Sequence, residues 1–163
     1  MPVPGSRVLA LFLENPVGIK HALHVCMAKS FRELDCWQLA FEISSCVKRL
    51  LKSGPAARDF KFRDQLLDSV RGPGRNIAEG FGRFNPTEIM QFLDFATASL
   101  DETENHLREG VESGYFPAEQ VAPVIVLVTR CRKAIASWHS YLRRQKDNPR
   151  FNQSRRRRPK NGS

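Results

Sequence analysis

The chain has 163 residues, of which 41% are hydrophobic, and a formal net charge of +9. This length favours one domain whose core needs no disulfide or metal, and no apolar run approaches the ~18 residues of a membrane span. The positive charge is concentrated near the C-terminus. Residues 141–163 hold nine Lys or Arg against one Asp, whereas residues 27–140 hold 15 basic and 15 acidic residues. The basic character therefore belongs to the tail and not to the predicted fold.

Residues 1–28 are expected to lie outside the fold, as a disordered extension or as sequence upstream of the true start. The apolar stretch from Val8 to Leu13 is shorter than the ~7–15 residues of a signal-peptide core, and Glu14 closes it. Met27 opens the run MAKSFREL, which is a natural start just before the first clear helical pattern.

The first helix is predicted to run from Ser30 to about Lys52. Ser30 suits the N-cap, with Glu33 at the spacing of a capping box. Gly54 and Pro55 stand where a helix stop places them. The apolar stripe of this helix is predicted to comprise Phe31, Leu34, Trp37, Phe41, Val47 and Leu50.

The second helix is predicted to start near Ala57 or Arg58 and to continue through the run RGPGRNIAEGFGRF, residues 71–84. Its apolar face comprises Phe62, Leu66, Leu67, Val70, Gly74, Ile77 and Phe81. Pro73 lacks the N–H that would bond to the carbonyl of Ser69 and is predicted to kink the helix. Glycine and proline both oppose a helix interior, so this run predicts a special packing demand. The glycines that would let another backbone approach closely are Gly72, Gly74, Gly80 and Gly82.

Polar residues within the same run need partners, because an unpaired buried polar group costs about 1–3 kcal/mol. Asn76 and Glu79 stand among apolar neighbours. Glu79 and Arg83 are four residues apart and are predicted to pair on one helix face. This pair is either a structural salt bridge at a helix contact or part of a face that touches a partner.

The third helix is predicted from Pro86 to about Glu112, because Pro86 fits the first helical position. One side is apolar and much of the remainder is acidic. The apolar side comprises Ile89, Phe92, Leu93, Ala96, Leu100, Thr103, Leu107 and Val111.

The fourth helix has the most regular pattern, with apolar residues at alternating steps of three and four. This seam comprises Val121, Val124, Val128, Cys131, Ile135, Trp138 and Leu142. Pro123 is interpreted as the effective helix start. Ile125, Val126 and Leu127 add apolar surface outside the seam, which indicates either oligomerisation or a wide core-facing stripe.

Four long helical patterns joined by short connections predict an all-α protein. We expect an antiparallel up-down-up-down four-helix bundle over residues 29–146 with disordered termini, residues 1–28 and 147–163.

The sequence offers little for catalysis or metal binding. A di-iron bundle site needs Glu-x-x-His, but Glu102 and His106 are four residues apart. Neither a nucleophile-elbow nor a P-loop motif is present. The cysteines form no zinc pattern and are expected to be reduced thiols; they are Cys26, Cys36, Cys46 and Cys131. We therefore expect no enzyme activity, no catalytic residues, no cofactor and no metal.

The arginine-rich tail is the strongest basic feature. Such a run can neutralise several phosphates and bind nucleic acid in a salt-dependent, sequence-independent way, or it can be a solvated tail that only adds charge. Arg71, Arg75 and Arg83 can extend a phosphate-facing surface onto the fold. The tail residues of this predicted nucleic-acid surface are Arg150, Arg155, Arg156, Arg157, Arg158 and Lys160.

Two sequence blocks resemble the family of the 23S ribosomal RNA intervening-sequence protein. The more specific block is NIAEGFGRF, residues 76–84, followed by PTEIMQFLDFATASLDE, residues 86–102. The other is FRELDCWQLA, residues 31–40, which is similar to the opening helix of the family. The resemblance covers about residues 30–145. Its signature, to which we also assign a role in assembly, comprises Asn76, Ile77, Ala78, Glu79, Gly80, Arg83 and Glu102.

This resemblance implies a small bacterial, cytoplasmic four-helix bundle that assembles as a homo-oligomer, a pentamer in the family. A related bundle is the accessory variability protein of diversity-generating retroelements, which binds nucleic acid and a reverse transcriptase. Two functions are therefore open for this chain, neither with a membrane partner. The first is a non-enzymatic homo-oligomer that associates with RNA or DNA, such as ribosomal RNA or a nucleoprotein. The second is a protein-interaction scaffold, such as a reverse-transcriptase accessory subunit, with the basic tail incidental.

Overall fold

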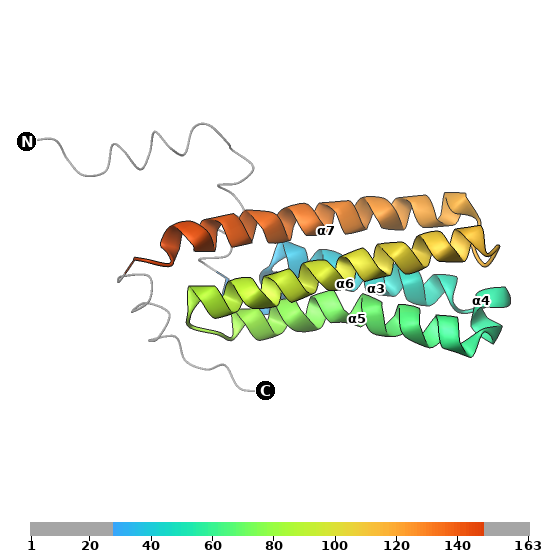
Figure 1. Cartoon of the computed structure of the whole chain (residues 1–163), viewed down its shortest axis with the longest axis horizontal. Coiled ribbons are helices and arrows are strands. Elements are labelled where there is room, and N and C mark those ends of the chain that lie inside the picture. The colour runs from blue at the N-terminus through green and yellow to red at the C-terminus, as the bar shows by residue number, and fades with distance from the viewer. Residues whose placement is uncertain (1–27, 149–163) are drawn as a thin grey trace, which may run out of the picture.

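The computed structural model describes residues 28–148, which contain four long helices and two short ones (Figure 1). The predictions made for residues 1–27 and 149–163 lie outside the described residues. The long helices are α3 (Asp35–Leu50), α5 (Phe60–Phe81), α6 (Pro86–Glu112) and α7 (Ala118–Gln145). The short ones are the 3-10 turn η1 (Phe31–Glu33) and α4 (Pro55–Arg58).

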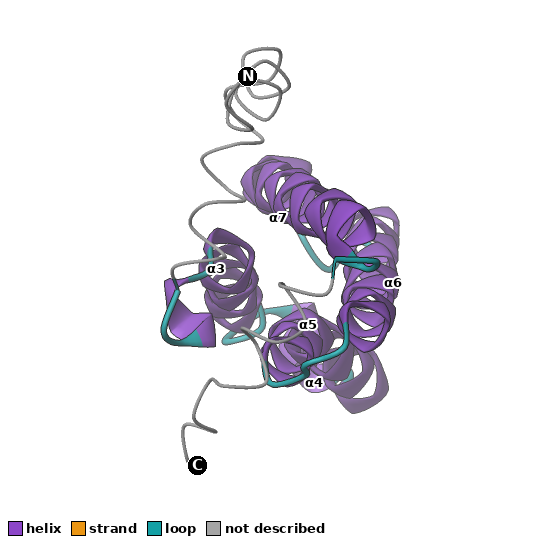
Figure 2. Ribbon diagram, turned by 90° about the vertical axis from the view of Figure 1, so that its left-hand side faces the viewer, coloured by secondary structure: helices purple, strands orange, loops and turns teal. Residues whose placement is uncertain are grey.

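The four long helices form a ring when they are seen end-on (Figure 2). Helix α5 packs against α3 and α6, and α7 packs against the same two neighbours. Strands are absent from residues 28–148. The predicted all-α, up-down-up-down four-helix bundle is therefore confirmed.

Polar caps fix the starts of α5 and α6. The Asp59 carboxylate accepts a hydrogen bond from the backbone N–H of Phe62 at 3.0 Å, and the Asn85 side chain accepts one from Thr87 at 2.9 Å. Each cap satisfies a backbone donor that has no partner inside the helix. Pro86 occupies the first turn of α6, as the sequence predicts.

Helix α6 ends in a Schellman motif. Gly114 adopts a φ of +71°, the left-handed region that favours glycine. The N–H of Tyr115 then donates to the carbonyl of Gly110 at 2.8 Å, and the N–H of Gly114 donates to Val111 at 3.0 Å. This turn reverses the chain into α7.

The predicted start of the first helix is wrong. Ser30 accepts a hydrogen bond from Arg32 across the η1 turn, and Glu33 accepts one from Lys29 instead of completing a capping box. Leu34 follows in an extended conformation and is 1% exposed. The α-helix therefore begins only at Asp35, because the turn before it places Leu34 in the core.

Two further helix starts differ from the predictions. The residues expected to open the second helix form the separate turn α4, because Asp59 is extended and caps α5 instead. Helix α7 begins at Ala118, and Pro123 is exposed inside it. A proline this near the start removes only one hydrogen bond, to the Glu119 carbonyl, so the helix tolerates it. Helix α5 likewise continues through the buried Pro73.

The predicted apolar stripe of the first helix is wrong at Phe41, whereas Trp37 packs against the core as predicted. The buried face of α3 consists of Cys36, Ala40, Ile43 and Val47. Trp37 is only half-buried and Phe41 is 60% exposed. Helix α3 turns this row toward α5 and α7, so Phe41, one position after Ala40, remains outside the core.

The predicted seam of α7 is confirmed, because all seven of its residues are buried. Leu127 is buried as well, which supports a wide core-facing stripe at that position. Val126 is 58% exposed and stays outside the core. The apolar surface beyond the core is therefore smaller than the sequence indicates.

Candidate nucleic-acid interface

The inner face of residues 71–84 is a close helix contact. A Cβ atom built on Gly72 would lie 2.6 Å from Cβ of Ser99, and one on Gly80 would lie 3.0 Å from Cβ of Phe92. Real Cβ atoms essentially never show the first distance, and the second is tighter than most real Cβ contacts. The close approach of α5 and α6 therefore requires glycine at position 72 and is eased by glycine at position 80. The predicted role of glycine in close helix approach therefore holds at Gly72 and Gly80.

The outer face of the same stretch borders a groove of about 320 Å³ between α3 and α5. Its walls combine aromatic side chains from η1 and α3 with arginines from α5, and no carboxylate lines it. The lining residues are Phe31, Trp37, Ala40, Phe41, Ser44, Val70, Arg71, Gly74, Arg75 and Ala78. We refer to this feature as the α3–α5 groove.

Three aromatic rings form a row along the α3 side of the groove. Phe31 meets Trp37 edge-to-face, with ring centroids 5.3 Å apart. Trp37 stacks on Phe41, with centroids 5.5 Å apart and an interplanar angle of 17°. These contacts keep the rings ordered although Phe41 is largely exposed, since offset aromatic pairs attract each other beyond their buried area.

The arginines on the α5 side have no acidic partner among residues 28–148. Arg71 and Arg75 are exposed and one helical turn apart, and no Asp or Glu of the described residues lies within 4.0 Å of either guanidinium. By contrast, Arg132 on α7 binds Asp101 at 2.8 Å and Glu104 at 2.9 Å. The charge on the α3–α5 groove is therefore available to an anion.

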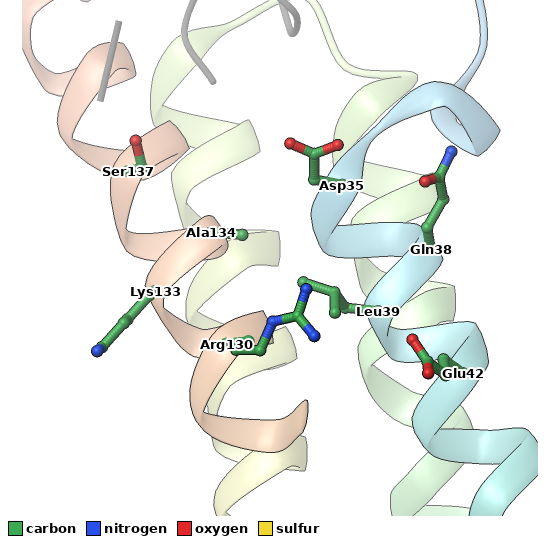
Figure 3. A pocket seen from close by; sticks show the side chains of 8 residues that line it. All are labelled: Asp35, Gln38, Leu39, Glu42, Arg130, Lys133, Ala134 and Ser137. Carbon is green, nitrogen blue, oxygen red and sulfur yellow. The ribbon is translucent and has the colours of Figure 1, made fainter. Parts of the chain in front are cut away.

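A second groove, between α3 and α7, has a different electrostatic character (Figure 3). Asp35 and Glu42 line it from α3, and Arg130 and Lys133 line it from α7. The Arg130 guanidinium extends toward α3, whereas Lys133 extends away from it (Figure 3). Opposite charges on the two walls disfavour a polyanion and suit a partner that carries charges of both signs.

The seam between α6 and α7 holds an ion-pair network that serves the fold. Glu104 accepts hydrogen bonds from Arg108 at 2.6 Å and from Arg132 at 2.9 Å. These bonds, that from Arg108 foremost, lower the pKa of the Glu104 carboxyl. The carboxylates on this side of α6 are thus engaged within the chain.

The cysteines of the core are inert. Burial, with Cys131 beside it, raises the pKa of the Cys36 thiol far above its ordinary value, and burial raises that of Cys131 to about 12. A thiol held neutral is neither a nucleophile nor a metal ligand. Residues 28–148 contain no group of three His, Cys, Asp or Glu placed to hold a metal ion. None of the helices in this part of the chain is long and apolar enough to cross a membrane.

Comparison with known families supports the resemblance read from the sequence. The profile described as "23S rRNA-intervening sequence protein" matches residues 32–137. The chain belongs to this family. The match runs from η1 through most of α7 and includes both walls of the α3–α5 groove. No curated protein matches the chain.

The signature residues that we assign to the 23S rRNA-intervening sequence protein family lie in different parts of the structure. Ile77 is fully buried, Gly80 contacts α6, and Ala78 lines the α3–α5 groove. Asn76 is half-buried. Glu102 lies on α6 beside His106, with Oε1 3.8 Å from Nε2, and is not brought to the other signature residues.

Arg83 differs from the other two arginines predicted to face phosphate. It pairs with Glu79, as the spacing predicts, and its guanidinium lies 5.1 Å from the ring centroid of Phe92. These contacts tie the end of α5 to α6 at the helix contact. Only Arg71 and Arg75 therefore share the groove, and the predicted tail residues lie outside the described residues.

The sequence analysis assigned the aromatic residues of the α3–α5 groove to the apolar core stripe and so missed their place in the groove. The missed residues are Phe31, Trp37 and Phe41. One signal was available, because α3 carries a second apolar row, Cys36, Ala40, Ile43 and Val47, beside the aromatic one. A helix that packs on two neighbours buries only one of two such rows completely.

Proposed function

We propose that this protein is a non-enzymatic bundle that associates with RNA, ribosomal RNA or a ribonucleoprotein, in the cytoplasm. The observation that carries the proposal is the pair Arg71 and Arg75. Both side chains are exposed on one face, and neither forms an ion pair with an Asp or Glu among residues 28–148. An Arg guanidinium that has no internal partner can release counterions from nucleic-acid phosphates on binding. The family name, which refers to a sequence within 23S rRNA, is consistent with this proposal.

The arginine-rich tail adds to the same function. The tail contributes six basic residues to the predicted surface: Arg150, Arg155, Arg156, Arg157, Arg158 and Lys160. They would increase the affinity for RNA without selecting a base sequence. The two arginines on α5 would then orient the bound nucleic acid on the bundle.

Assembly as a homo-oligomer, a pentamer by the family resemblance, is part of the proposal. Phe95 on α6 is 49% exposed and Val126 on α7 is 58% exposed. Single exposed apolar side chains also occur on monomers, so the family resemblance carries this part of the proposal. Light scattering at micromolar concentration tests this part, and a monomeric mass would contradict it.

Fluorescence anisotropy of a labelled hairpin of ribosomal RNA tests association, at about 50 mM and about 200 mM salt. We expect binding that weakens steeply with salt, and weaker binding after deletion of residues 148–163 or after R71Q with R75Q. Absence of binding by the full chain at the lower salt would overturn the proposal.

The α3–α7 groove favours a second candidate function, docking of a partner protein. Its opposed charges, Asp35 and Glu42 against Arg130 and Lys133, match the mixed surface of a protein better than a phosphate backbone. If deletion of residues 148–163 abolishes RNA binding while the oligomer persists, this scaffold function becomes the better account of the bundle.

A further inference from the structure

We propose that the α3–α5 groove binds single-stranded RNA, with unpaired bases stacked on Trp37 and Phe41 and with phosphates held by Arg71 and Arg75. The inference rests on the proposed association with RNA. It adds the form of RNA, the site and the residues that make the contacts.

The aromatic row supplies the stacking platform. Trp37 and Phe41 are close to parallel, at 17°, and Phe41 is 60% exposed. Burying a large aromatic side chain is favourable. A ligand that covers the exposed part of the Phe41 ring would therefore gain free energy of binding. Bases of any sequence can stack on such rings, because every base has a π-face.

The opposite wall supplies the charge. Arg71 and Arg75 are four residues apart on α5, which is about 6 Å along the helix axis. Their guanidinium groups can therefore contact two phosphates of one strand, or one phosphate from two sides. The absence of carboxylates from the lining residues leaves nothing in the groove to repel the backbone of the RNA.

Two further hydrogen-bonding groups belong to residues that line the groove. Among residues 28–148, neither the Ser44 hydroxyl nor the Trp37 indole N–H has a hydrogen-bond partner. Gly74 leaves the indole open to the groove, since a Cβ built there would lie 3.8 Å from Nε1. These groups can meet base edges, which are accessible only in unpaired RNA.

Charge also disfavours a second copy of the chain as the occupant. The acidic side of α6 would be the natural partner for the arginines, but several of its carboxylates are engaged within the chain. Asp101 and Glu104 bind Arg132, and Asp94 lies 3.4 Å from His139. Duplex RNA fits less well, because its bases are stacked on one another and cannot reach the rings.

Intrinsic fluorescence separates stacking from general binding. The chain has two tryptophans, and Trp138 is 1% exposed, so a base can stack only on Trp37. We expect an oligouridylate RNA of about 12 nucleotides to quench the fluorescence of the full chain. W37F should abolish the quenching but retain most of the affinity measured by anisotropy, because phenylalanine also stacks.

Substitutions in the groove test the contacts. F41A should weaken oligouridylate binding about tenfold, the effect of one lost stacking contact. R71Q with R75Q should lower the slope of log K against log salt by about 1.4, the value for two phosphates of a single strand. Matched controls are F60A, an exposed phenylalanine at the start of α5, and R130Q with K133Q in the α3–α7 groove, and both should bind as wild type.

Three outcomes would overturn the inference, and they are distinguishable. If the full chain binds the ribosomal hairpin but oligouridylate neither quenches Trp37 nor responds to F41A, the groove assignment fails and the proposed function survives. If the full chain binds neither RNA, both fail. If F41A lowers the mass measured by light scattering, the groove is covered by a second copy.

Discussion

The two faces of α5 between residues 71 and 84 show how one short stretch can meet two different physical demands. On the inner face, Gly72 and Gly80 present no side chain, and Ser99 and Phe92 of α6 occupy the space. On the outer face, Arg71 and Arg75 extend into an open groove beside the aromatic rings of α3. Adjacent residues such as Arg71 and Gly72 therefore differ completely in surroundings.

This difference indicates where stability and where binding reside. The inner face is close-packed, so any added atom must displace a neighbour. The outer face leaves apolar and charged groups in water, an arrangement that contributes little to folding and suits a ligand. Substitutions on the two faces should therefore separate into those that change the free energy of unfolding and those that change affinity.

The largest effect is expected for G72A. The new methyl carbon would lie 2.6 Å from Cβ of Ser99, and overpacking of this kind destabilises by about 1–3 kcal/mol. G74A is the matched control, because its Cβ would meet nothing closer than 3.8 Å. Replacement of a mid-helix glycine by alanine should stabilise there by about 0.5–1 kcal/mol. Urea unfolding of both variants measures the free energy of unfolding, which should fall for G72A and rise for G74A.

A second substitution checks the cause assigned to G72A. S99G removes the side chain that the new methyl group would strike, so G72A with S99G should recover most of the loss. If the double variant is as unstable as the sum of the single variants, the contact between α5 and α6 does not limit the space at Gly72.

A smaller effect is expected from acid, and it contrasts paired with unpaired arginines. Hydrogen bonds from Arg108 and Arg132 hold the Glu104 pKa below its ordinary value of 4.5. Its contribution to stability is therefore present above that value and is lost as the pH falls through the lower pKa of the folded state. E104Q should flatten the loss of stability that urea unfolding shows as the pH falls below about 4.5.

The arginines of the groove should not share this pH dependence. R71Q with R75Q is expected to follow the wild-type curve, because no carboxylate among residues 28–148 pairs with either residue. An altered acid limb in this double variant would mean that the groove arginines take part in folding electrostatics.

The smallest effect on stability is expected for the outer face itself. R71Q with R75Q removes exposed groups and should change the free energy of unfolding by no more than about 0.5 kcal/mol. F41A also removes the stacking contact with Trp37 and should cost about 0.5–1.5 kcal/mol. Thermal or urea unfolding provides the measurement. A loss in R71Q with R75Q comparable to that of G72A would show that the two faces are not separable.

Much of the fold follows from periodicity and punctuation in the sequence. Helix α6 has the predicted bounds, because Asn85 and Pro86 start it and Gly114 ends it through local backbone chemistry. The seam of α7 is buried as predicted, because one regular stripe leaves no choice of face. The start of α3 was less predictable, since burial of Leu34 depends on tertiary contacts. The start of α5 was open to prediction, because the Asp59 cap is a local hydrogen bond to the N–H of Phe62.

The candidate site divides in the same way. Helical period, turn residues and charge are local properties, so the four helices, the family and the arginines on α5 could be recognised in the sequence. Which of the two apolar rows of α3 is buried depends on how the helices pack. Packing of α3 on α5 and α7 buries one row and leaves Trp37 half-buried and Phe41 exposed. Both aromatic side chains line the groove that Arg71 and Arg75 also line. A helix pattern records which residues share a face, but contact with neighbouring helices determines which face remains open to a ligand.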